Sequence, residues 1–218
     1  AFAAAGARIV PVPVDDDGLV VAALPADVNI VCVSPSHQFP LGLAMSLPRR
    51  LALLEMARAS GAVIVEDDYD SEFRYGGRPL DALQTLDRDG LVFYVGTFSK
   101  TLFPSLRLGF LVAPPQLAEQ IGICLDAYSP GVPTALQGIV ADFIVEGHFA
   151  THVRRMRKLY QERHNALIEA AGGHLAGDLN IIPTHTGMHT IAYLRDGLDA
   201  VALTQAAARR GITVAPIS

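Results

Sequence analysis

The sequence feature that most constrains the fold is a series of short, continuously apolar segments that each end in polar residues. Residues 29–33 and 62–65 are such segments, and residues 48–59 between them have apolar side chains at helical spacing. A strand–helix–strand order with fully apolar strands is typical of a parallel sheet covered by helices on both faces. Ligands bind at the carboxyl ends of such strands. Polar clusters follow the strands at residues 34–42, 66–74 and 96–107.

The rest of the chain predicts an α/β fold that continues into a smaller α+β unit. The other expected helices cover the stretch from Pro114 to about Tyr128, a long region over 134–171 interrupted near Gly147, and residues 199–210. The other expected strands cover 9–14, 188–194 and 212–215. A break at SPGVPT separates a partial large domain (1–133) from an interdomain helical region (134–170) and a partial small domain (171–218).

Composition narrows the class of protein. The chain has 218 residues, 50% of them hydrophobic, and a formal net charge of -5. It is long enough for a sizeable core, and its mild acidity argues against direct binding of nucleic acid by this segment. Cys32 and Cys124 lie in apolar stretches, so we expect buried free thiols in a reducing cytoplasm. We expect no signal peptide or membrane span. The ends, AFAAAGARIV and ITVAPIS, favour a segment truncated at both ends.

Lys100 is the first candidate functional residue. It follows an apolar run that begins at Leu91, with hydroxyl residues on both sides and Arg107 seven residues further on. A lysine at the end of a buried strand could form a Schiff base with a carbonyl compound. Arg107 and Thr97 could bind a phosphate dianion. Together these groups suggest pyridoxal 5'-phosphate (PLP). The alternative is a surface hairpin with an ordinary solvated lysine.

Asp67 is the second candidate, at the end of the strand AVIVEDD. A carboxylate there could be a general base, a metal ligand, part of an acidic loop, or the partner of a pyridinium nitrogen, which keeps the ring protonated as an electron sink. Tyr69, two residues later, could approach the 3' oxygen of the cofactor. A strand-end aspartate followed 33 residues later by a strand-end lysine makes the pyridinium role the most coherent one.

The order of this aspartate and lysine resembles the fold-type I PLP enzymes of the aspartate aminotransferase superfamily. Four segments, SPSHQFPLG, VIVEDDYDSEFRY, PLDALQTLD and VGTFSKTLFPSLRLGFLVAP, together resemble more closely the MocR-type regulators of the GntR family. These bacterial transcription regulators join an N-terminal winged-helix DNA-binding domain to an aminotransferase-like domain. The resemblance implies a PLP-dependent transferase-like fold. It also implies an internal aldimine on Lys100, pyridine nitrogen binding by Asp67, a 3' oxygen contact from Tyr69, and phosphate binding by Thr97 and Arg107.

Two departures separate the chain from the related enzymes. Many of these enzymes read Asp-Asp-Pro-Tyr where this chain has Asp67-Asp68-Tyr69. They carry Asn-Pro-Thr-Gly where this chain has FPLG within HQFPLG, so Phe39 replaces the asparagine that contacts the 3' oxygen. By the resemblance, Gln38 or His37 would supply that contact, or it would be lost. Because the phosphate loop and the stacking aromatic residue of the family precede the matched region, we expect this segment alone to bind PLP weakly or not at all.

The resemblance implies an effector-sensing domain that binds PLP and a small amine or amino acid, with DNA contacted only through a winged-helix domain outside this chain. The full-length protein is expected to be a cytoplasmic homodimer. The alternatives are a working aminotransferase and a scaffold that has lost its cofactor. No metal site is expected: Asp15–Asp17 lack calcium-loop spacing, and the pair His148 and His152 lacks a third ligand nearby. The basic residues of 152–167 favour a solvated or interdomain helix face.

Overall fold

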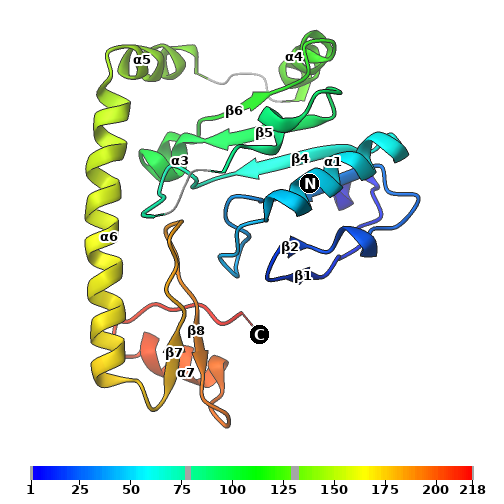
Figure 1. Cartoon of the computed structure of the whole chain (residues 1–218). Coiled ribbons are helices and arrows are strands. Elements are labelled where there is room, and N and C mark those ends of the chain that lie inside the picture. The colour runs from blue at the N-terminus through cyan, green and yellow to red at the C-terminus, as the bar shows by residue number, and fades with distance from the viewer. Residues whose placement is uncertain (1, 77–79, 129–132, 218) are drawn as a thin grey trace.

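A computed structural model describes residues 2–76, 80–128 and 133–217. Its centre is a four-stranded sheet in the order β3–β4–β5–β6, which is also the order along the chain (Figure 1). The first three strands run parallel, and β6 is antiparallel to β5. The strands are β3 (Ile30–Val33), β4 (Val63–Asp68), β5 (Val92–Thr97) and β6 (Gly109–Val112). The predicted α/β fold with a mostly parallel sheet is confirmed.

Helix α1 (Leu47–Ser60) makes the crossover between β3 and β4 and fits the predicted helix closely. Pro48 lies in its first turn, where its missing N–H removes no helical hydrogen bond, and Gly61 ends it in the left-handed conformation. Leu53 and Ala57 of α1 are fully buried, and the first core cluster joins them to apolar side chains of β3, β4 and β5. This packing holds the strands whose carboxyl ends form the candidate site.

The two predicted buried thiols are exposed in the structure. Cys32 alternates along β3 with the buried residues Val31 and Val33, so its side chain lies on the opposite face from theirs. Ile30, on the same face as Cys32, is 48% exposed. Cys124 is exposed on α4 (Ala118–Tyr128). An apolar neighbourhood in the sequence predicted a strand or a helix here, but not which face would be covered.

The predicted strand over 9–14 does not form. Pro11 and Pro13 lack the N–H donors that strand pairing needs. A hairpin of β1 (Val14–Asp15) and β2 (Gly18–Leu19) follows instead, with Gly18 at a positive φ beside Met45. Short 3-10 helices, η1 (Ala3–Ala5) and η2 (Val21–Ala23), complete this region.

Helices α5 (Thr134–Val145) and α6 (His148–His174) confirm the long helical region and its interruption at Gly147. Figure 1 shows α6 running from the sheet to a C-terminal unit of β7 (Leu179–Ile181), β8 (Ala192–Leu194) and α7 (Ala200–Ala208). Asp199, the first residue of the predicted helix, is the N-cap of α7. The strand predicted over 188–194 is confined to β8, and the one predicted over 212–215 is absent. Of the predicted break, residues 129–132 lie outside the described residues.

The β7–β8 hairpin reaches from the C-terminal unit towards the sheet (Figure 1). Along the chain, α2 (Leu83–Leu86) lies between β4 and β5, and α3 (Phe98–Thr101) and η3 (Pro104–Leu106) lie between β5 and β6. Among the residues described, none of the helices combines the length and the apolar character that crossing a membrane requires.

Candidate cofactor site

The carboxyl ends of β4 and β5 bring the predicted aspartate and lysine to one edge of the sheet. The strands pair in parallel, with Asp67 opposite Val95 and Asp68 opposite Gly96. Thr97 ends β5, and the chain turns at once into α3, which contains Lys100. Thus residues 33 positions apart in sequence meet at the edge where ligands bind in such sheets.

Lys100 lies in the single turn of α3, whereas the sequence predicted a loop. The turn forms because Thr97 acts as its N-cap: the hydroxyl oxygen accepts a hydrogen bond from the Ser99 N–H at 3.1 Å. The Lys100 side chain is exposed and makes no hydrogen bond or ion pair with any residue that the structure describes. Its amine is therefore free to react or to bind a ligand.

Arg107 has an unusual backbone conformation. With φ at 51° and ψ at 31°, it is the one non-glycine residue at positive φ in the described part of the chain. A left-handed conformation costs a residue with a Cβ roughly 1–2 kcal/mol, and such strain gathers at functional sites. The guanidinium is exposed and has no partner among the described residues. Arg107 thus presents an exposed guanidinium with no anionic partner among the described residues, two positions before β6 begins.

Asp67 differs from the two acidic residues beside it. Glu66 is fully buried and caps α2 by accepting bonds from Leu83 and Gln84, and Asp68 accepts bonds from Ser71 and Tyr94. Asp67 is exposed and has no such partner within the described residues. Partial burial raises the pKa of Asp67, and the negative charges of Asp68 and Asp70 raise it further. A carboxylate with anionic neighbours gains most from a cationic partner.

The structure places Tyr69 and His37 in contact with each other. The Tyr69 hydroxyl donates a 2.9 Å hydrogen bond to the carbonyl oxygen of His37, and burial together with Asp70 raises the Tyr69 pKa. The His37 ring is turned into the interior and bonds to Asp70, so it is not an open ligand in this conformation. Gln38 reaches the carbonyl of Phe39 at 3.3 Å, and Phe39 itself is 64% exposed.

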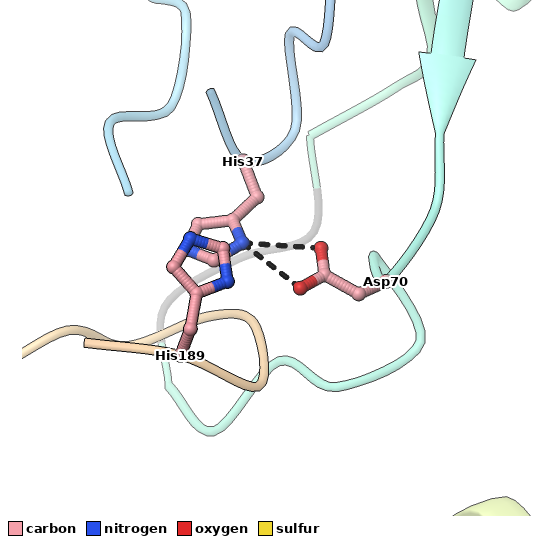
Figure 2. A group of neighbouring side chains, drawn as sticks. All are labelled: His37, Asp70 and His189. Atoms are coloured by element: carbon pink, nitrogen blue, oxygen red, sulfur yellow. Dashed lines mark hydrogen bonds and ion pairs between the residues drawn. The ribbon is translucent and has the colours of Figure 1, made fainter. Parts of the chain in front are cut away.

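A cluster of His37, Asp70 and His189 lies beside these residues (Figure 2). Nδ1 of His37 is 2.9 and 3.1 Å from the two Asp70 oxygens, and the His37 and His189 rings are 4.3 Å apart. Imidazole and carboxylate are metal-binding groups, but 2.9 Å is the length of a charge-assisted hydrogen bond. The structure therefore supports a hydrogen-bonded pair of His37 and Asp70 with the His189 ring packed against it.

Sequence reasoning missed Asp70 and His189. Asp70 is separated by 33 positions from His37, and His189 by more than a hundred. The only local signal was the last acidic residue of EDDYD, which was interpreted as part of an acidic loop.

The open groups at the sheet edge fit PLP. Asp67 offers an anion for a protonated ring nitrogen, Arg107 a cation for a phosphate, and Lys100 an amine. The Thr97 hydroxyl proton is held only by a long, 3.4 Å bond to the Leu108 carbonyl, so it can be given to a ligand oxygen. When bound, PLP supplies an aldehyde that condenses with an amine and a ring that withdraws electrons.

The whole chain, residues 1–218, matches the family model of aminotransferase class I and II, and the chain belongs to that family. It is 29% identical to Pyrococcus horikoshii kynurenine aminotransferase, whose structure it matches with a TM-score of 0.84 over 95% of this chain and 54% of that one.

The chain is also similar to transcription regulators. It is 45% identical to the probable rhizopine catabolism regulatory protein MocR of Rhizobium meliloti, over 98% of this chain and 44% of the relative. It is 33% identical to the HTH-type pyridoxine biosynthesis transcriptional regulator PdxR of Corynebacterium glutamicum, over 98% of this chain and 46% of the relative. The resemblance inferred from the motifs is confirmed, and the chain spans about half the length of these relatives.

Proposed function

We propose that this chain is the effector-sensing, PLP-binding part of a GntR/MocR-type transcription regulator. The observation that carries the proposal is the edge where β4 and β5 end. There an unpartnered carboxylate, Asp67 of β4, and a free amine, Lys100 of the α3 turn that directly follows β5, lie at the same edge of the sheet. The similarity to MocR and PdxR supports regulation as the use of that site.

Each residue has a proposed role. Lys100 holds PLP covalently, Asp67 pairs with its ring nitrogen, and Arg107 and Thr97 bind its phosphate. Tyr69 lies near the 3' oxygen and shares its hydroxyl with the His37 carbonyl. A small amine or amino acid is the proposed effector, because an amine can displace Lys100 from the cofactor.

The effector can change DNA binding only if it binds two arrangements of the protein with different affinity. The proposed full-length protein is a cytoplasmic homodimer that contacts DNA through an N-terminal winged helix.

The second candidate function is amino group transfer. The match to aminotransferase structures favours it. Phe39 weighs against efficient turnover, because it stands where the related enzymes have asparagine. Its side chain packs edge-on against His189 at 5.3 Å and cannot donate a hydrogen bond.

The test uses the full-length protein mixed with PLP. We expect the visible absorbance of lysine-bound PLP at a stoichiometry of one per chain, and we expect Lys100→Ala to abolish it. Lys158→Ala, on the exposed face of α6, is the matched control and should leave the spectrum unchanged. An unchanged spectrum in Lys100→Ala would show that the lysine assignment is wrong. Sustained turnover of an amino acid with a keto acid acceptor would favour the aminotransferase instead.

A further inference from the structure

The loop between β7 and β8 is docked on the segment that follows the predicted cofactor residues. Its backbone pairs with residues 73–75: the Gly187 N–H donates to the Phe73 carbonyl and the Tyr75 N–H donates to the His185 carbonyl, both at 2.8 Å. The Tyr75 hydroxyl adds a 2.7 Å bond to the Gly187 carbonyl. The C-terminal unit is thus hydrogen-bonded to the chain segment that begins with Asp67 and Tyr69.

Asp70 joins this loop to the loop that follows β3. Its carboxylate accepts a 3.1 Å bond from the Met188 N–H and binds His37 Nδ1 at 2.9 Å. The side chains of Asp70 and His37 are only 2% and 1% exposed. A buried carboxylate is tolerated when it is fully hydrogen-bonded, and here the bonds come from two segments far apart in sequence. Asp70 therefore fixes the position of one segment relative to the other.

The docking is tight enough to require glycine at position 187. Gly187 has a φ of +81°, and a Cβ at this position would overlap Cε1 of the His37 ring. The next ring in the loop, His189, packs against His37 with centroids 4.3 Å apart and stacks over Tyr69 at 6.3 Å. The loop thus places the His189 ring against two residues of the proposed cofactor site, His37 and Tyr69.

The charges around His189 include the lysine of the proposed site. Burial lowers the pKa of His189, and the positive charges of His37 and Lys100 lower it further, whereas Asp70 raises it. The Pro40 carbonyl also faces the ring. On the side of α6, His189 borders a cavity of about 340 Å³ whose lining includes Tyr160, Arg163 and His164. The direct neighbours of the His189 ring are His37, Phe39 and Tyr69, and Lys100 is the weakest of the charges that act on it.

We propose that His189 is a positioning residue of the Lys100 site, supplied by the C-terminal unit and held in place by Asp70 and His37. The inference rests on the proposed PLP function and deepens it. It names the contact through which a movement of the β7–β8 loop would reach the site: withdrawal of the loop would remove the His189 ring from Tyr69 and from His37. An effector that favours one loop position would act through this contact.

The experiment is a pH titration of the visible absorbance of full-length, PLP-loaded protein, compared with variants at His189. In the wild type we expect an acid-side step, because protonation of His189 would add a positive charge against the ring of Tyr69, the proposed neighbour of the 3' oxygen. His189→Phe keeps the packing, and His189→Gln keeps polarity without titrating. Both should lose the acid-side step and retain bound PLP. His174→Phe, on the exposed end of α6, is the control and should keep the step.

The outcomes separate this inference from the proposed function. Wild-type absorbance with an acid-side step that persists in both His189 variants would overturn the inference and leave PLP binding intact. If the His189 variants fail to fold, Asp70→Asn provides the second test, since a loosened loop should weaken the same step. A step of full size in Asp70→Asn would count against the role of Asp70. No absorbance of lysine-bound PLP in the wild type would overturn the proposed function, and this inference with it.

Discussion

Arg50 provides the sharpest test of how the fold supports the site. It is fully buried on α1, and its guanidinium donates to three backbone carbonyls: Met45 at 3.0 Å, Asp81 at 2.9 Å and Pro35 at 2.7 Å. Pro35 and Met45 are the two ends of the loop that contains His37 and Phe39. Burial lowers the pKa of Arg50, while Glu66 and Asp68 raise it. One side chain thus closes the loop at both ends.

Arg50→Lys tests the geometry because it keeps the charge and removes the planar fork of donors. An ammonium can direct a good bond to about one of the three carbonyls, so about two hydrogen bonds from a charged donor are lost, at about 1–2 kcal/mol each. We therefore expect the opening free energy of residues 35–45 to fall by about 2–4 kcal/mol. This corresponds to backbone hydrogen exchange that is about 30 to 900 times faster.

The assay is hydrogen exchange of the full-length protein, resolved by mass spectrometry for the peptides that cover 34–46. Arg58→Lys is the matched control, since Arg58 lies on the same helix with an exposed side chain. Exchange in Arg50→Lys that matches Arg58→Lys and the wild type would refute the reasoning, because the three bonds would then contribute nothing to closing the loop.

Three further outcomes are expected. Gly187→Ala should lower the unfolding free energy by about 3 kcal/mol, because it adds left-handed strain and an overlap with His37. The control Gly197→Ala has a φ of +88° but open space around it, so it should lower the unfolding free energy by only about 1 kcal/mol. Equal shifts of the thermal midpoint in the two variants would contradict this prediction. Arg107→Gly relieves backbone strain and should change the unfolding free energy by less than about 1 kcal/mol. The same substitution should weaken PLP binding at least about tenfold in a spectroscopic titration. Unchanged affinity for PLP would exclude the phosphate-binding role of Arg107. Burial and His185 lower the pKa of His164 below its ordinary 6.5, so the unfolded chain binds the proton more readily than the folded chain. The unfolding free energy should therefore fall as the pH drops through 6.5 towards the lowered pKa. His164→Phe should flatten that part of a plot of thermal midpoint against pH.

The sequence predicted those parts of the fold that local pattern controls. Apolar runs bounded by glycine and proline located β3, β4 and β5, and helical spacing located α1 to within one residue at each end. The strand over 9–14 failed because two prolines outweighed its apolar pattern. The prediction of buried thiols was wrong because the burial of Cys32 and Cys124 depends on what covers each face of β3 and α4, and no local sequence pattern encodes that.

The candidate site was predicted only as far as strand order allowed. Asp67 lies at the end of β4 and Lys100 in the turn that directly follows β5, and the carboxyl ends of these neighbouring strands lie at one edge, so the pattern of strands was enough to bring the two residues to the same edge. Asp70 and His189 meet through the docking of a distant hairpin, which depends on backbone pairing at residues 73–75. Such pairing has no signature in composition or spacing, and the contact therefore appears only in three dimensions.

The long helix α6 has a mechanical consequence. Its 27 residues form one uninterrupted rod of about 40 Å that starts at Gly147, whose positive φ separates it from α5. Near its start, His152 Nε2 lies 2.9 Å from the Thr101 carbonyl, next to Lys100, and Arg157 donates to the Glu72 carbonyl at 2.7 and 2.9 Å. A rotation of about 10° about His152 would sweep the far end of the helix, about 33 Å away, through about 6 Å. A small change beside Lys100 would therefore be enlarged along the length of α6 before it reached the C-terminal unit.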